Sequence, residues 1–151
     1  MRTPATDRLA ELGIAFRLLE YDEVEKTALE VARKLDLAPG SVYKTLLAAS
    51  GREFALAVVP GTGELSLKAL ARAWGRPSCA MADPGDITRQ TGYVRGSVSP
   101  LGTKRALKVF VDASARGRQV AVSAGRRGLE LVLAGDDLVR AAGAEWAELL
   151  R

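Results

Sequence analysis

Residues 42–59 have the sequence VYKTLLAASGREFALAVV, and this stretch decides the fold class. It contains two apolar segments, 42–49 and 54–59, with the short polar segment Ser50-Gly51-Arg52 between them. Apolar segments of this length, joined by a few residues that include glycine, are typical of a β-hairpin. We therefore predict a hairpin in the middle of the chain.

Helix caps and further apolar segments surround this hairpin. Before it we expect a helix that begins after Thr3, a strand over 16–21 and a helix capped by Thr27. After it we expect a helix capped by Ser66, a short strand over 78–81, a helical turn from Asp83, strands over 109–112, 119–123 and 128–133, and a helix from Asp136 that residues 144–151 continue or follow. Strands and helices do not alternate strictly, which favours an α+β fold with a mixed sheet or partly closed barrel.

Length and composition indicate one globular domain over residues 1–151. The chain is 48% hydrophobic and 26% charged, close to the averages of globular proteins. No apolar run is long enough for a membrane span, and the first residues do not resemble a secretory signal. Cys79 is the only cysteine, so no intrachain disulfide can form. These features predict a cytoplasmic protein without a membrane partner.

The sequence contains no histidine, which restricts the chemistry more than any other feature. Ser-His and Cys-His nucleophilic pairs are excluded, as are zinc sites that use histidine. One cysteine cannot form a thiolate cage for a metal. We therefore expect neither a metal nor a cofactor, and any catalysis must use other side chains, backbone amides or the substrate itself.

The net charge of +4 and the isoelectric point near 9.5 suit a polyanionic partner such as a nucleic acid. Solvated surface charge explains such a balance equally well. Most of the basic residues singled out here lie in the second half of the chain: Arg95, Lys104, Arg105, Lys108, Arg116, Arg118, Arg126 and Arg127.

Lys44 lies inside the first predicted hairpin strand. Strand alternation places it on one face with Leu46 and Ala48, whereas Tyr43, Thr45 and Leu47 share the other face. A lysine with apolar neighbours either protects a sheet edge or provides a functional cation at a pocket wall. The pattern alone favours the edge.

Two glycine-containing loops are the other candidates for function. Residues 92–102, GYVRGSVSPLG, contain three glycines and a proline, and such a loop either directs backbone amides at a ligand or forms a structural Ω-loop. Residues 123–128, SAGRRG, lack the Gly-Lys-Ser/Thr ending of a phosphate-binding loop, so we interpret them as a turn between strands.

Several of these segments together resemble a known family. Tyr43-Lys44-Thr45-Leu46-Leu47, Met81-Ala82-Asp83-Pro84, Thr91-Gly92-Tyr93, Ser99-Pro100-Leu101-Gly102 and Arg127-Gly128-Leu129 occur in this order. The chain is thereby similar to the YbaK/EbsC family of trans-editing aminoacyl-tRNA deacylases, related to the editing domain of bacterial prolyl-tRNA synthetases. The resemblance extends from the first helix to about Val139.

The resemblance implies a mixed, mostly antiparallel sheet curled into a barrel and flanked by helices. It implies cleavage of mischarged aminoacyl-tRNA, with prolyl-tRNA synthetase as a candidate partner. It assigns Lys44 and Gly96 to catalysis. It assigns substrate binding to Tyr21, Thr27, Ser97, Ser99, Pro100, Ser123 and Glu130.

The chain also departs from the family pattern. Gly96-Ser97 replaces Gly-Gly, Ser123-Ala124-Gly125 replaces Ser-Gly-Gly, Thr27 replaces an aromatic residue, and Glu130 stands in place of an aspartate. These positions bear on amino-acid specificity, for which cysteinyl-tRNA(Pro) is the first candidate and alanyl-tRNA(Pro) the second. A non-catalytic tRNA-binding module and a small-ligand regulatory protein are the alternative functions.

Overall fold

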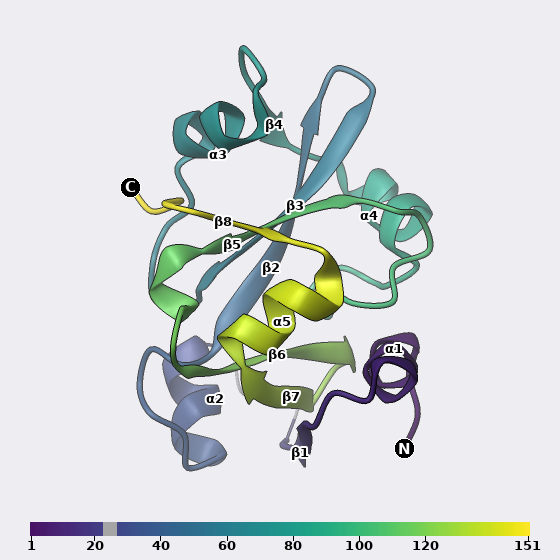
Figure 1. Ribbon diagram of the computed structural model, residues 1–151, viewed down its shortest axis with the longest axis vertical. Helices are drawn as coiled ribbons and strands as arrows, with labels where there is room; N and C mark the ends of the chain where they lie inside the picture. The colour runs from purple at the N-terminus through teal and green to yellow at the C-terminus, as the bar shows by residue number, and fades with distance from the viewer. Residues whose placement is uncertain (23–26) are drawn as a thin grey trace.

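The computed structural model describes residues 1–22 and 27–151 of the chain (Figure 1). Within these ranges the helices are α1 (Pro4–Leu12), α2 (Ala28–Lys34), α3 (Leu67–Trp74), α4 (Pro84–Thr91) and α5 (Gly135–Ala142), with a short 3₁₀ helix, η1 (Ala113–Ala115). The strands are β1 (Arg17–Glu20), β2 (Tyr43–Ser50), β3 (Glu53–Pro60), β4 (Ala80–Met81), β5 (Lys108–Asp112), β6 (Gln119–Arg126), β7 (Leu129–Ala134) and β8 (Glu145–Ala147).

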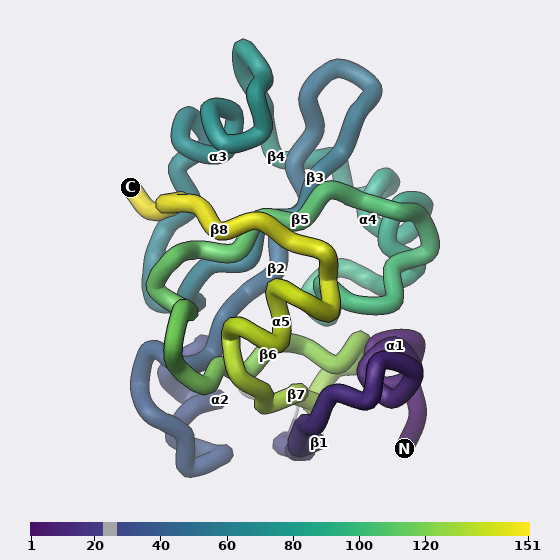
Figure 2. The backbone as a smooth tube through the Cα atoms, viewed as in Figure 1, coloured from purple at the N-terminus to yellow at the C-terminus, as the bar shows by residue number. Residues whose placement is uncertain are grey.

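The strands form two sheets, one with the order β4-β2-β3-β5-β8 and one with the order β1-β7-β6. The predicted hairpin is confirmed as the antiparallel pair β2–β3, which Ser50 and Glu53 close at the tip that protrudes at the top of Figure 2. Two pairs, β3–β5 and β5–β8, are parallel. A parallel bridge between Val42 and Ala121 links the two sheets. The α+β class is therefore confirmed, and closure of the strands into a barrel stays a prediction.

The five-stranded sheet is buried on both faces. Leu56 and Val58 of β3 belong to the largest hydrophobic cluster, which also contains residues of β6, β7, α1 and α5. Ala57 and Val59 point to the other face and belong to a second cluster with Leu70 of α3. This double burial explains why residues 54–59 of the sequence are continuously apolar.

Local capping chemistry sets the starts of three helices where the sequence predicts them. The hydroxyl of Thr3 accepts a hydrogen bond from the Thr6 N–H, that of Thr27 from the Glu30 N–H, and that of Ser66 from the Ala69 N–H. Each bond satisfies an amide that the first helical turn leaves without a partner. No helix within the described ranges is long and apolar enough to cross a bilayer.

The prediction of helix for residues 144–151 is wrong. Helix α5 ends at Gly143, which adopts the left-handed conformation with φ of 60°. The chain then forms β8, in which Trp146 pairs with Val111 of the parallel strand β5. Asp112 of β5 anchors the following residues, because its carboxylate accepts the Leu149 N–H at 2.9 Å.

Candidate active site

A cavity of about 810 Å³ lies on the β2 side of the molecule, where α2, the start of α4 and the 95–98 loop meet β2, β6 and β7. This volume falls within the range of about 300–1,000 Å³ that small-molecule sites occupy. Six of the nine predicted site residues line it: Lys44, Gly96, Tyr21, Thr27, Ser123 and Glu130. Residues separated by more than 100 positions in the sequence therefore share one cavity.

Lys44 lies where β2 lacks a neighbouring strand. In the described part of the chain, β4 pairs only with Ala48 and Ala49, so residues 44–46 form an open sheet edge. The Lys44 side chain is half-buried, and no hydrogen bond or ion pair from residues 1–22 or 27–151 engages its ammonium group. Lys44 can therefore both protect a sheet edge and provide a cation at a pocket wall, because this edge borders the cavity.

Gly96 occupies the third position of a tight turn. The Ser97 N–H donates to the Val94 carbonyl at 3.0 Å, and Gly96 has a φ of 88°. A positive φ at this position is typical of a type II turn and favours glycine. The turn presents backbone at the cavity wall without a side chain.

Glu130 is the buried acid of the site. It lies on β7 opposite Ser123 of β6 and is only 6% exposed. Its Oε2 atom has no hydrogen-bond partner among the described residues. Burial raises the pKa of this carboxyl from 4.5 to about 8, so it is mostly protonated at neutral pH. A buried polar atom without a partner costs about 1–3 kcal/mol, which a ligand donor would offset.

Two polar residues outside the predicted site set also line the cavity. Thr45 has a buried Oγ1 without a partner in the described ranges, and Arg95 is exposed at the rim next to Gly96. The signal for Thr45 was a polar residue between Tyr43 and Leu47 on an otherwise apolar strand face. The signal for Arg95 was a cation inside a glycine-rich loop.

Ser97, Ser99 and Pro100 do not line the cavity, although the resemblance assigns them to substrate binding. All three are buried in the loop that follows Gly96. The Ser99 hydroxyl accepts the Leu101 N–H at 3.3 Å, so its visible contact is within the loop. Their roles in binding stay a prediction. The Ser97 hydroxyl donates to the Val94 carbonyl at 3.3 Å and so supports the turn at Gly96.

Residues 123–128 form less of a turn than expected, because β6 continues to Arg126. A bulge interrupts the pairing of β6 with β7 between Ser123 and Arg126. Within it the Ser123 hydroxyl accepts the Gly125 N–H at 3.0 Å. A side chain at Gly125, which has a φ of 98°, would overlap the ring of Tyr93. The bulge therefore holds Ser123 beside Glu130 and packs against the 92–102 loop.

The chemistry of this lining suits a ligand with both anionic oxygens and an amino group. Lys44 and Arg95 supply cations, the Gly96 turn supplies backbone, and Glu130 supplies an unpaired carboxyl. Within residues 1–22 and 27–151, no three His, Cys, Asp or Glu side chains form a cluster suited to a metal ion.

Comparison with known families gives a match over most of the chain. The model of a family described as "Aminoacyl-tRNA editing domain" matches residues 22–141. The EbsC protein of Enterococcus faecalis, named as a candidate Cys-tRNA(Pro)/Cys-tRNA(Cys) deacylase, is 33% identical over 131 residues, which cover 85% of this chain and 80% of EbsC. The proline–tRNA ligase of Fervidobacterium nodosum is 33% identical over 97 residues, or 64% of this chain and only 17% of the ligase.

Solved structures show the same fold. The crystal structure of a candidate trans-editing enzyme for prolyl-tRNA synthetase superposes with a TM-score of 0.88 at 24% identity, covering 100% of this chain and 99% of the other. The crystal structure of the hypothetical protein APE2540 superposes with a TM-score of 0.89, also at 24% identity, covering 99% and 100%.

Proposed function

The chain belongs to the family of aminoacyl-tRNA editing domains, and from this membership we propose that it is a trans-editing deacylase whose active site is the cavity at Lys44. It cleaves the ester between a wrongly attached amino acid and the terminal ribose of tRNA, without a metal or histidine. The first candidate substrate is cysteinyl-tRNA(Pro), since the EbsC relative carries that name. The observation that supports the proposal most is the convergence of Lys44, Gly96 and Glu130 on one cavity.

Lys44 and Gly96 have complementary roles in this proposal. Ester cleavage passes through a tetrahedral intermediate with a negatively charged oxygen, and oriented donors stabilise it. The Lys44 ammonium group, which has no partner in the described part of the chain, binds the phosphate or ester oxygens of the terminal adenosine. The backbone around Gly96 holds the ester carbonyl.

Glu130 recognises the amino group of the attached amino acid. The ester leaves that group as a free amine or ammonium, which is a hydrogen-bond donor in either form. It supplies the partner that Glu130 Oε2 lacks. An ammonium group would also favour ionisation of the carboxyl and lower its pKa from about 8.

The attacking group differs with the amino acid. In a cysteinyl ester, the substrate thiol attacks the carbonyl carbon, a carbon–sulfur bond forms, and the bond to the ribose oxygen breaks. The thiol proton is transferred to the ribose oxygen, which leaves a cyclic thiolactone and free tRNA. An alanyl ester has no thiol, so water or the neighbouring ribose hydroxyl attacks instead. The lack of histidine favours attack by the substrate itself.

Editing compensates for the limited selectivity of prolyl-tRNA synthetase among small amino acids. A hydrophobic pocket separates analogues that differ by one methylene by only about 1–3 kcal/mol. Cysteine and alanine are small enough to enter a proline pocket, so a second site must remove the errors. The enzyme acts in the cytoplasm with translation, and prolyl-tRNA synthetase is its candidate partner.

Replacement of Lys44 tests this proposal. We expect Lys44→Ala to lower the deacylation rate about a hundred- to a thousand-fold, because it removes one donor to the developing charge. The measurement is single-turnover deacylation of cysteinyl-, alanyl-, seryl- and prolyl-tRNA. Cleavage of the cysteinyl ester alone would favour attack by the thiol, and cleavage of the alanyl ester would show attack by water or ribose.

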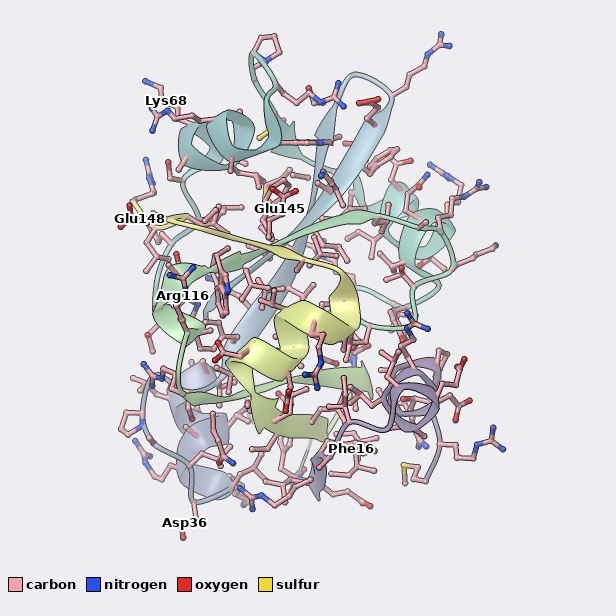
Figure 3. All side chains as sticks on the ribbon, in the orientation of Figure 1. Phe16, Asp36, Lys68, Arg116, Glu145 and Glu148 are labelled. Carbon is pink, nitrogen blue, oxygen red and sulfur yellow. The ribbon has the colours of Figure 1, made fainter. Side chains whose placement is uncertain are left out.

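Lys68→Ala is the matched control. Lys68 is exposed on α3 and does not line the cavity, so the same charge is lost away from the site (Figure 3). A wild-type rate in Lys44→Ala would reject the central role of Lys44. Tight tRNA binding by the wild-type protein without cleavage of any ester would favour the non-catalytic binding module.

A further inference from the structure

A second hollow of about 420 Å³ adjoins the site. It lies between the tip of the β2–β3 hairpin, the end of α3, the end of α4 and the segment that leads into β5, all in the upper half of Figure 2. We call it the basic cleft, because Arg52, Arg76, Arg105 and Lys108 line it together with a single carboxylate, Glu53. Nothing in the proposed chemistry of the cavity uses it.

Two of the four cations in the basic cleft are compensated and two are not. Arg76 forms an ion pair with Glu53. The Lys108 ammonium group donates to the carboxylate of Glu145 in β8 at 2.6 Å, and Glu145 is labelled in Figure 3. Arg52 and Arg105 are exposed and have no ion pair with any described residue. The cleft therefore offers two free guanidinium groups, which suit phosphate oxygens in paired hydrogen bonds.

The cleft is held by contacts within the fold. The Arg105 N–H donates to the Gln90 carbonyl at 3.1 Å, and the Lys104 N–H donates to the Thr91 carbonyl at 2.9 Å. These bonds fix the segment before β5 against the last turn of α4. On the other side, the Arg76 guanidinium stacks over the Trp74 ring at 5.3 Å. The backbone that carries Arg105 is thus positioned before any ligand binds.

Helix α4 connects the basic cleft to the cavity. Pro84 and Ile87 line the cavity, and Gln90, three residues further along the same helix, lines the cleft. At a rise of 1.5 Å per residue, Ile87 and Gln90 are about 4.5 Å apart along the axis. The β2–β3 hairpin also connects the two hollows. Leu47 of β2 lines the cavity, and Phe54 of β3, which pairs with Ala49 two residues after Leu47, lines the cleft.

We propose that the basic cleft binds backbone phosphates of the acceptor stem of the tRNA whose aminoacylated end occupies the cavity. This inference rests on the proposed function for the identity of the ligand. Arg52 and Arg105 then contribute affinity for the RNA duplex and take no part in ester cleavage. The position of the cleft beside the cavity, along α4, makes it a second contact for one continuous polyanion.

The test compares long and short substrates. We expect the double variant Arg52→Ala/Arg105→Ala to raise KM for full-length aminoacyl-tRNA about tenfold at 0.1 M salt, with kcat unchanged, because two phosphate contacts are lost. KM for an aminoacylated CCA trinucleotide, which lacks the stem, should stay at the wild-type value. The slope of log Kd for uncharged tRNA against log salt should become shallower by about 1.8, or about 0.9 per duplex phosphate.

The control double variant Arg8→Ala/Arg140→Ala removes the same charge from α1 and α5, which lie against the three-stranded sheet. An equal effect of this control, or an unchanged KM and salt slope in the cleft variant, would overturn the proposal. Binding of uncharged tRNA is measured without catalysis. If the cleft variant binds uncharged tRNA with the expected loss of affinity and salt dependence, but the wild-type protein cleaves no ester, the deacylase function is rejected and the cleft proposal stands.

Discussion

The buried carboxyl of Glu130 makes protein stability depend on pH. Its pKa is about 4.5 when the chain is unfolded and about 8 in the folded protein, because burial disfavours the charged form. Between these values the folded state holds a proton that the unfolded state has released. The stabilisation is therefore complete below pH 4.5 and is lost as the pH rises to about 8.

The free energy of unfolding should accordingly fall between pH 5.5 and pH 8, by roughly 1–3 kcal/mol in total. The chain contains no histidine, so few other side chains titrate in this window. Urea unfolding at several pH values measures the change. Glu130→Gln should remove most of the slope, since the amide is neutral throughout. Equal slopes in the variant and the wild type would show that another group is responsible.

At the residue scale, sequence reasoning works for groups whose chemistry is unusual for their position. Lys44 is detectable as a cation in an apolar strand, but only the fold shows that its sheet edge borders a cavity. Pattern alone does not identify Glu130, because its burial depends on β1, β6 and β7 together. Ser97 and Ser99 resemble ligand-binding residues in the sequence, yet they are buried within their own loop.

At the element scale, the position of α2 depends on Gly61. A side chain at Gly61 would overlap Ala28, the first residue of α2, and would lie 3.1 Å from the Val42 carbonyl. We expect Gly61→Ala to displace the start of α2, where Thr27 and Val31 line the cavity, and to lower kcat/KM about ten- to a hundred-fold. Steady-state deacylation kinetics and thermal unfolding measure the two consequences.

Gly85→Ala provides the comparison for this change. Gly85 lies in α4, and a Cβ there would make only ordinary contacts, at 3.5 Å or more, with the Arg89 guanidinium. The substitution should be neutral or stabilise the protein by up to about 1 kcal/mol, because alanine favours a helix. A full loss of activity in Gly85→Ala, or none in Gly61→Ala, would contradict the role assigned to α2.

Elements with a strong local signal are predictable, whereas a very short strand that depends on a distant partner is not. The caps at Thr3, Thr27 and Ser66 lie within one turn of the helices they begin, so the sequence contains their whole signal. Strand β8 has only three residues, and its partner β5 lies more than 30 positions earlier. Nothing in residues 144–151 encodes that partner, which explains the wrong prediction of a helix.

At the scale of the whole molecule, the two sheets share one buried cluster. Leu56 and Val111 of the five-stranded sheet belong to the same cluster as Val122 and Leu131 of the three-stranded sheet. Neither sheet can bury its inner face without the other. We therefore propose that residues 1–151 fold as a single domain, as their length and composition predict.

The two tryptophans allow a direct test of whether residues 1–151 unfold as a single domain. Trp74 belongs to the cluster beneath α3, whereas Trp146 packs against the cluster shared by the two sheets and lies 5.0 Å from the Arg116 guanidinium. Trp74→Phe leaves a reporter for the shared cluster, and Trp146→Phe leaves one for the α3 side. In each variant, tryptophan fluorescence and far-UV circular dichroism should give the same urea midpoint, because a single domain of this size unfolds in one cooperative step. Two separate midpoints within one variant would mean that the α3 layer unfolds independently of the shared cluster.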